Sequence, residues 1–198
     1  MPGDIETILD RIDLKMFENS IQTDRTGYHS SYQPLLEAVS RLMVQKDSVA
    51  ALGIAHLCYG WMPATLRNVK LASHNQSVDL MLGAVRSAKT SEDATSQLAL
   101  WTEESPINRS WIGASKFLHF INPGVFPIWD RHIAGHCGYG YQYQYNTKTA
   151  YLSYVEEVHQ ALKHPIIPGL QHVINARFGY SPTKVRAVEV ALINAALL

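Results

Sequence analysis

The spacing of apolar residues constrains this chain more than any other feature of its sequence. Apolar side chains recur every three or four positions along most of the 198 residues, and the alternation typical of β-strands is scarce. That period brings apolar side chains onto one side of an α-helix. Because short stretches of Gly, Pro, Asn and Ser separate the periodic segments, the sequence predicts an all-α fold, a compact bundle of about ten helices.

Residues at the segment ends indicate where these helices begin. We expect Asp4 to cap a first helix whose apolar side includes positions 5, 8, 9 and 12, and residues 21–33 to form a loop. Proline in a first turn and serine or threonine at a cap mark further starts. Further helices are expected from residues 34, 48 and 63, over 77–88 and 91–104, from 110 or 113, from 127, over 147–163, and from 169 and 181–182.

The composition fits one well-packed unit. With 46% hydrophobic residues, the chain can form a single domain over 1–198, or two lobes, about 1–104 and 105–198, with a cleft between them. The two cysteines form no CxxC pair, the first residues do not resemble a secretory signal, and no run approaches the roughly 18 apolar residues of a membrane span. We therefore expect a cytoplasmic monomer that contacts no membrane.

Charge is distributed unevenly along the chain. Residues 1–104 contain 9 Lys and Arg against 13 Asp and Glu, and residues 105–198 contain 8 against 4, while the formal charge of the whole chain is zero. A polyanion such as DNA would therefore favour the second half. Random scatter of surface charge explains the difference equally well.

The stretch NPGVFPIWDRHIAGHCG, residues 122–138, contains a single carboxylate, Asp130. Pro127 predicts the start of a short helix, which would place Asp130 in the first turn, where the positive end of the helix dipole stabilises a carboxylate. Asp130 can serve this structural purpose alone. Its neighbours Trp129, Arg131 and His132 favour a functional site instead.

The longer run GASKFLHFINPGVFPIWDRHIAG resembles the core of the helix-hairpin-helix DNA glycosylase superfamily. In that family a hairpin ends in a glycine, a helix follows, and a proline-containing segment presents the catalytic aspartate. Asp130 falls on this aspartate and His132 two residues after it, over a match of about 25 of the 198 residues. The resemblance implies a DNA glycosylase without a cofactor or metal, which removes a damaged or modified base in repair or in anti-phage defence.

Lys116 is the second candidate catalytic residue. Bifunctional members of the family carry a lysine nucleophile before the aspartate, but Lys116 lies only 14 residues before Asp130, about five fewer than in the family. A difference of about five residues exceeds one helical turn, so the spacing gives no reason to place Lys116 in the same pocket. We therefore expect a monofunctional enzyme that leaves an abasic site, with Lys116 as a phosphate contact or an alternative nucleophile.

A carboxylate and a set of rings suit the chemistry of base removal. Cleavage of an N-glycosidic bond builds positive charge on the sugar, which Asp130 can stabilise while it orients the attacking water. The base must leave the helical stack, so aromatic side chains are needed to hold it, although core packing explains the tryptophans as well. The base pocket is expected to include Trp111, His119, Trp129, His132, Tyr139 and Tyr141.

Two other segments are candidates for contact with DNA. In GYGYQYQYN, residues 138–146, alternation puts the tyrosines on one side if the chain is extended, as a stacking surface, a small β-hairpin or a loop over the pocket. Ser181 and Pro182 predict a capped helix start that receives anions, with Lys184 and Arg186 just inside it. Together with Arg131, these residues are the expected contacts to the DNA backbone, and an ordinary capped terminal helix is the alternative.

Three alternatives use the same residues differently. Arg131 and His136 have the Arg-x4-His spacing that resembles HEPN ribonucleases, which would make the protein an RNA-cleaving enzyme. His132, His136 and Cys137 can also be interpreted as metal ligands, although no second carboxylate or cysteine pair lies near them. The third alternative is a non-enzymatic helical DNA-binding protein.

Overall fold

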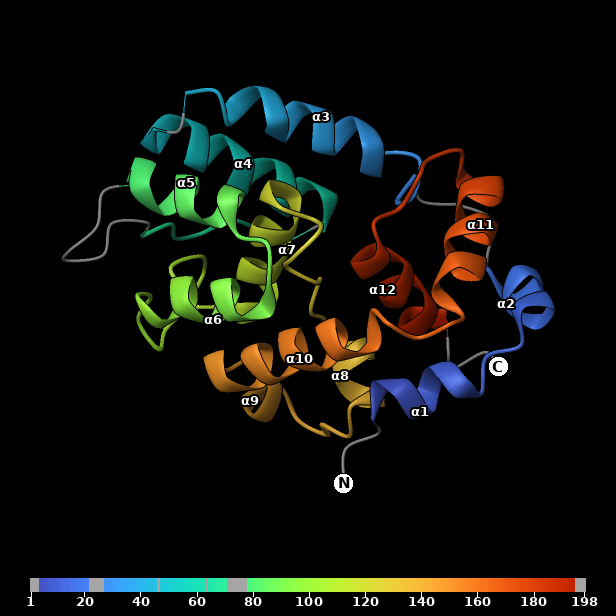
Figure 1. Ribbon diagram of the computed structural model, residues 1–198. Helices are drawn as coiled ribbons and strands as arrows, with labels where there is room; N and C mark the ends of the chain where they lie inside the picture. The colour runs from blue at the N-terminus through green and yellow to red at the C-terminus, as the bar shows by residue number, and fades with distance from the viewer. Residues whose placement is uncertain (1–3, 22–26, 46, 63, 71–77, 195–198) are drawn as a thin grey trace.

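Twelve α-helices make up most of the chain that the computed structural model describes, which comprises residues 4–21, 27–45, 47–62, 64–70 and 78–194 (Figure 1). No strand forms in these ranges, so the all-α prediction is confirmed. None of the described helices is long and apolar enough to cross a lipid bilayer. The helices are α1 (Ile5–Asp10), α2 (Leu14–Ser20), α3 (Tyr32–Leu42), α4 (Ser48–Trp61), α5 (Val78–Ser87), α6 (Ser91–Ala99), α7 (Trp111–Ile121), α8 (Arg131–His136), α9 (Gln142–Tyr145), α10 (Lys148–Ala161), α11 (Ile167–Phe178) and α12 (Lys184–Asn194).

Side-chain caps fix several of the helix starts that the sequence predicts. Asp4 accepts a hydrogen bond from the N–H of Glu6 at the start of α1, and Ser110 accepts one from Gly113 at the start of α7. Thr147 caps α10 in the same way, through the N–H of Ala150. Each cap satisfies N–H groups that have no partner within the helix, which is why these short polar residues set the boundaries.

Helix α7 lies at the centre of the molecule, in contact with α3, α4, α5 and α10 (Figure 1). Nearly all of its side chains are buried, as expected for a helix that is apolar on every side. Gly113 permits the close approach of α4, because a Cβ atom there would lie 2.1 Å from the hydroxyl oxygen of Tyr59. Cys58 of α4 and Cys137, which follows α8, are buried free thiols.

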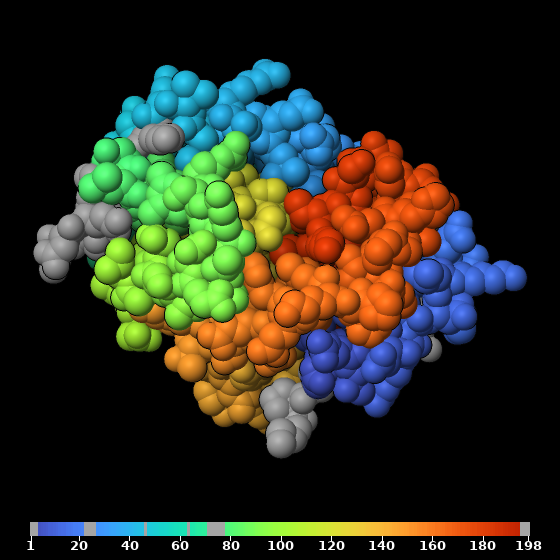
Figure 2. Space-filling model, in the orientation of Figure 1, coloured from blue at the N-terminus to red at the C-terminus, as the bar shows by residue number. Residues whose placement is uncertain are grey.

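The first two helices pack against the last three. Helix α1 contacts α10 and α12, and α2 contacts α11 and α12. Figure 2 shows the same arrangement, with the blue N-terminal segment against the orange and red C-terminal helices. A boundary near residue 104 therefore does not coincide with the packing, because residues 4–21 lie with the end of the chain.

The helix predicted from Pro63, with Arg67 and Lys70, does not form. Pro63 lies outside the described residues, and residues 64–70 are not helical. The N–H of Lys70 donates to the carbonyl of Pro106 at 2.7 Å, and the side chain of Asn108 accepts from the N–H of Arg67. Backbone groups that a helix would use internally are therefore used to join this segment to residues 105–109.

Two other boundaries differ from the sequence prediction. The helix expected over 91–104 ends at Ala99, and the tyrosine-rich residues 138–146 form neither a hairpin nor an extended strand. They contain the short helix α9, whose start is fixed by the Gln144 side chain, which accepts from the N–H groups of Gly140 and Tyr141. Instead of one row, the tyrosines form two pairs: Tyr139 and Tyr145 lie against Trp129, and Tyr141 stacks on Tyr143.

Candidate functional site

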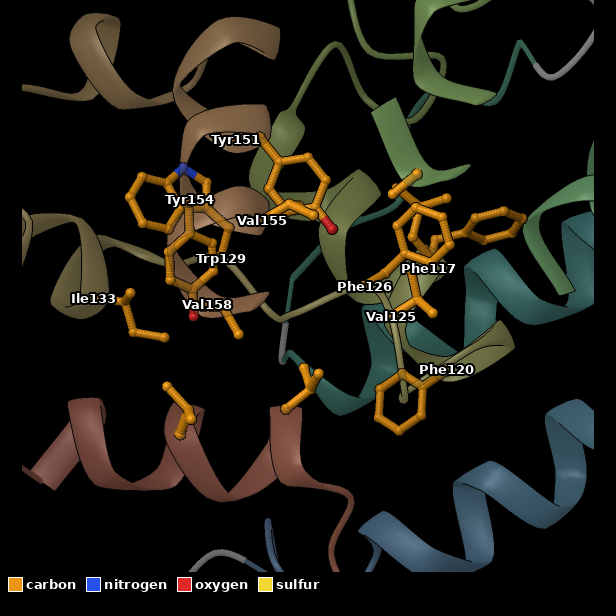
Figure 3. Packing of buried hydrophobic residues seen from close by; sticks show 14 of the residues in the cluster. Phe117, Phe120, Val125, Phe126, Trp129, Ile133, Tyr151, Tyr154, Val155 and Val158 are labelled. Carbon is orange, nitrogen blue, oxygen red and sulfur yellow. The ribbon is translucent and has the colours of Figure 1, made fainter. Parts of the chain in front are cut away.

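The segment between α7 and α8 turns at Asn122, whose carbonyl accepts from the N–H groups of Val125 and Phe126, and then passes through the interior of the protein. Residues 125–129 are buried, and the chain reaches the surface again at Asp130, which is half-buried. Figure 3 shows Phe126 and Trp129 of this segment among side chains of α7 and α10. A buried segment of this kind must find partners for its polar backbone groups outside itself.

Three polar side chains of α7 supply some of these partners. The Oγ of Ser115 accepts from the N–H of Trp129 at 2.9 Å, and the Nζ of Lys116 donates to the carbonyl of Trp129 at 2.9 Å. The Nδ1 of His119 lies 2.8 Å from the carbonyl oxygen of Phe126. Helix α7 thus holds both ends of the buried segment.

Helices α10 and α12 hold the same segment from other sides. The hydroxyl of Tyr151 donates to the carbonyl of Pro127 at 3.1 Å, and the Nε2 of His159 lies 2.9 Å from the carbonyl oxygen of Val125. From α12, the carboxylate of Glu189 accepts from the N–H of Ile128. Side chains from three helices therefore fix the backbone that leads to Asp130.

Asp130 is the N-cap of α8 and not a residue of its first turn. The prediction that Pro127 starts this helix is wrong, because α8 begins at Arg131 and Pro127 lies in the buried segment. The Oδ1 of Asp130 accepts from the N–H groups of His132 at 2.8 Å and Ile133 at 3.0 Å. Within the described part of the chain, Oδ2 accepts no hydrogen bond.

The structure brings Lys116 to the segment that carries Asp130, despite the short spacing between them. Lys116 is only 5% exposed, and its amine also lies 3.3 Å from the carbonyl of Ile112. Burial lowers the pKa of Lys116 to about 8, against the opposite influence of the nearby Asp130 and Glu189 carboxylates. The two candidate catalytic residues thus lie close enough to influence each other.

Arg186, which the sequence analysis assigns to the DNA backbone, is fully buried. Its Nη1 donates to Glu189 at 3.0 Å, and its guanidinium carbon lies 4.5 Å from the centre of the Tyr32 ring. Burial opposes charge on both partners. Even so, His119, Arg186 and the N–H of Ile128 together hold the pKa of Glu189 below its ordinary value. Arg186 therefore belongs to a buried ion pair and does not reach a surface phosphate.

The start of α12 also differs from the prediction. Ser181 is not the cap, because the Oγ1 of Thr183 accepts from the N–H of Arg186 at 3.1 Å. Thr183 also donates to the carbonyl of Pro123 at 2.8 Å, which ties α12 to the loop after α7. Ser181 and Lys184 remain exposed at this helix start.

Both tryptophans expected in a base pocket are core residues. Trp111 is 1% exposed and donates to the carbonyl of Glu103, and Trp129 is fully buried and donates to the carbonyl of Tyr145. The ring of Trp129 lies beside that of Tyr154 (Figure 3), with 4.5 Å between the ring centres. In this structure neither ring is accessible for stacking with a base.

The expected pocket residues outside the core lie around α8 and α9. His132 and Arg131 are exposed, and Tyr139 is half-buried against Trp129. Tyr141 is 65% exposed and stacks on Tyr143, which is 74% exposed, at 5.8 Å between ring centres. The fully buried His119 lies apart from this group, within the core.

Tyr28 is a further residue whose ionisation the charges of this region influence. Its ring stacks on Trp61 at 3.8 Å between ring centres. Burial raises the pKa of Tyr28, the Arg186 charge opposes this increase, and the Asp130 carboxylate adds to it. Tyr28 falls in a predicted loop, where no periodic pattern marks it. Glu189 could have been identified from the sequence, because it is the sole acidic residue in an otherwise largely apolar predicted helix.

The geometry supports neither the ribonuclease pair nor the metal site. Arg131 and His136 lie at the two ends of α8, and five residues along a helix turn the side chains by roughly 140°, so they do not share a face. In the part of the chain that the structure describes, no three His, Cys, Asp or Glu side chains are grouped to hold a metal ion.

Comparisons of the chain with models of protein families, with curated proteins and with solved structures found no match. Inference about function therefore depends on the residues themselves. The best-defined group of these is the buried segment 125–129 with Asp130 at its end and Lys116 beside it.

Proposed function

We propose that the protein is a DNA N-glycosylase in which Asp130 is the catalytic carboxylate. One observation carries the proposal. Asp130 stands at the surface end of a backbone segment fixed by side chains of α7, α10 and α12, and its Oδ2 is free of hydrogen bonds within the described residues. Such preorganisation is what electrostatic stabilisation of a transition state requires.

The reaction is the hydrolysis of one bond. As the bond between C1′ of the deoxyribose and the base nitrogen breaks, its electron pair leaves with the base and positive charge develops on the sugar. The Asp130 carboxylate stabilises this charge and orients a water molecule toward C1′. The water oxygen bonds to C1′, the base takes up a proton, and an abasic site remains.

Lys116 supports the carboxylate in this proposal and does not attack the sugar. Its amine donates to the carbonyl groups of Ile112 and Trp129, which suits an ammonium group that holds the segment before Asp130. Water is therefore the nucleophile, and borohydride is expected to trap no covalent complex with DNA. A trapped complex that disappears in Lys116→Met would instead assign the attack to the amine.

The substrate is a damaged or modified base in DNA. Duplex and single-stranded oligonucleotides with a panel of oxidised, alkylated, deaminated and hypermodified bases are incubated with the protein. Alkali then cleaves the strand at each abasic site. The position of cleavage identifies the base that is removed.

Asp130→Asn is expected to lower the rate of base removal by about a hundredfold or more, the usual contribution of a charged catalytic group. Asparagine is as good an N-cap as aspartate, so α8 is expected to persist. The matched control is Asp47→Asn, because Asp47 caps α4 through the N–H of Ala50. Equal activity of Asp130→Asn and the control would refute the proposal.

The same assays distinguish the other functions. Cleavage of RNA that depends on Arg131 and His136 would identify a ribonuclease. Binding of DNA without release of any base would identify a non-enzymatic DNA-binding protein.

A further inference from the structure

A buried ion pair lies directly behind the segment that carries Asp130. Arg186 and Glu189, one turn apart on α12, are both fully buried, with 3.0 Å between Nη1 and Oε2. The other carboxylate oxygen, Oε1, accepts from the N–H of Ile128 and lies 3.1 Å from the Nδ1 of His119. Glu189 therefore contacts the segment two residues before Asp130.

The cluster continues to α3. The Nε2 of His119 lies 2.7 Å from the hydroxyl of Tyr32, and Arg186 lies over the ring of the same tyrosine. Since Nδ1 of His119 faces two acceptor oxygens, we assign its hydrogen to that atom, and Nε2 then accepts from Tyr32. One connected group of side chains thus joins α3, α7 and α12 to the Asp130 segment.

Packing alone does not account for charges at this position. Moving two ions out of water is costly, and apolar side chains of similar volume often stabilise a fold as well or better. The Nε and Nη2 of Arg186 have no hydrogen-bond partner among the described residues, which adds to the cost. An apolar pair would offer no charged acceptor to the N–H of Ile128. A hydrogen bond to a charged acceptor is stronger than a bond between neutral groups.

We propose that Glu189, held by Arg186 and His119, is a positioning residue that fixes the backbone before Asp130 and so sets the place of the catalytic carboxylate. This inference rests on the proposed function, and it concerns the rate of the chemical step. Glu189 is buried, so it does not touch the substrate. Its removal should affect the turnover of bound DNA and not the binding of DNA.

The principal test replaces both charges with apolar residues of similar size. In Arg186→Met/Glu189→Leu no unpaired charge remains, and the avoided desolvation of two ions offsets the lost acceptor of the Ile128 N–H, so the melting temperature is expected to stay close to that of the wild type. Loss of the acceptor frees the N–H of Ile128, whose hydrogen exchange is expected to become about tenfold faster or more, while amides of α10 keep their rates. Misplacement of a catalytic group by about 1 Å costs up to about a hundredfold in rate, so single-turnover base removal should fall by about ten- to a hundredfold. The Kd for DNA is expected to stay within about threefold.

Glu189→Gln provides a second variant, which keeps the shape of the side chain and removes its charge; because Arg186 then lacks its carboxylate partner, this variant is expected to melt below the wild type. It should show the same changes in exchange and rate with a smaller magnitude. Asn194→Ala is the matched control, because Asn194 is a buried polar residue of α12 whose side chain, among the described residues, bonds to the carbonyl of Val190 within its own helix. Exchange at Ile128 and the rate of base removal are expected to stay at wild-type values in this control.

Each outcome supports or overturns the positioning role of Glu189. Base removal by the double variant within about threefold of the wild type would overturn the positioning role, and so would faster exchange at Ile128 without loss of rate. Equal losses in Asn194→Ala would show a general effect of α12 and would also overturn it. If the wild type releases no base from any probe, the proposed function fails, while exchange at Ile128 still shows whether Glu189 holds the segment.

Discussion

At the scale of single residues, Lys116 couples the candidate site to the stability of the fold. Its amine is buried beside the segment that carries Asp130, and burial lowers its pKa from 10.5 to about 8. The folded protein therefore disfavours the charged lysine relative to the unfolded chain. Between these two pH values the unfolded chain binds more protons, so raising the pH stabilises the fold.

Lys116→Met is expected to remove this dependence on pH. The free energy of unfolding of the wild type should increase relative to that of the variant as the pH rises from about 8 to 10.5, by at most about 3 kcal/mol. Urea titrations at several pH values measure the free energy of unfolding of both proteins. Only the difference between the two proteins is used, because buried tyrosines titrate in both. The matched control is Lys148→Met, which removes another buried amine that donates to a carbonyl. If the difference in unfolding free energy between the wild type and Lys116→Met stays constant with pH, the prediction is contradicted.

The sequence predicted the position of a residue correctly where its chemistry stands out from its neighbours. It did not do so where the position depends on which helix face is buried. Asp130 stands out as a lone carboxylate, and the structure places it at a helix start. Arg186 was misassigned because its helix is apolar on every side, so periodicity did not tell which face points inward. Its partner Glu189 is three residues later, and only the fold shows that Glu189 contacts the segment after α7 while Arg186 lies over the ring of Tyr32.

At the scale of secondary-structure elements, local side-chain bonds decided which predicted boundaries hold. Asp4, Ser110 and Thr147 are caps by residue type, and each forms the expected bond. Pro127 misled because proline fits an extended backbone as well as a first helical turn. The segment 64–70 misled because its partners lie about forty residues away, at 105–109, beyond the range of any local pattern.

Gly113→Ala is expected to destabilise the contact between α4 and α7 by about 1–3 kcal/mol, the usual cost of overpacking. Its Cβ would lie 2.1 Å from the hydroxyl oxygen of Tyr59 and 2.9 Å from the ring carbon that bears it. Adding Tyr59→Phe should recover part of the loss, because it removes the nearer atom. Thermal unfolding measures both, with Gly83→Ala on α5 as the control, since no atom lies within 4 Å of its added Cβ. Equal stability of Gly113→Ala and this control would contradict the close approach.

At the scale of the whole molecule, the fold closes by bringing its first helices to its last. Ile5, Leu9 and Phe17 are fully buried in helices that contact α10, α11 and α12. The length and hydrophobic content of the chain allowed two lobes divided near residue 104, but neither property shows which distant helices pack together. Contacts between the ends of a chain depend on the complete fold, so the sequence alone did not predict them.

Removal of residues 1–21 is therefore expected to abolish cooperative unfolding. Each large apolar side chain that loses its buried position costs about 1.5–3 kcal/mol, and several such losses equal the typical stability of a domain, about 5–15 kcal/mol. Calorimetry and near-ultraviolet circular dichroism measure the outcome. Met16→Ala, at a side chain that is 53% exposed, is the control and should melt like the wild type. A sharp transition in the shortened chain at the wild-type temperature would show that α1 and α2 are dispensable.

The two buried thiols allow the rate of local opening to be measured at two places in the molecule. Burial raises the pKa of Cys58 above its ordinary value and that of Cys137 to about 12, so neither is a reactive thiolate in the native state. Cys58 lies on α4, within the helices around α7, and Cys137 ends α8, immediately beyond the turn that Asp130 begins. An alkylating reagent reaches each sulfur only when its own surroundings open. The ratio of the two labelling rates therefore compares the breathing of α8 with that of the α4 region, and no foreign probe is required.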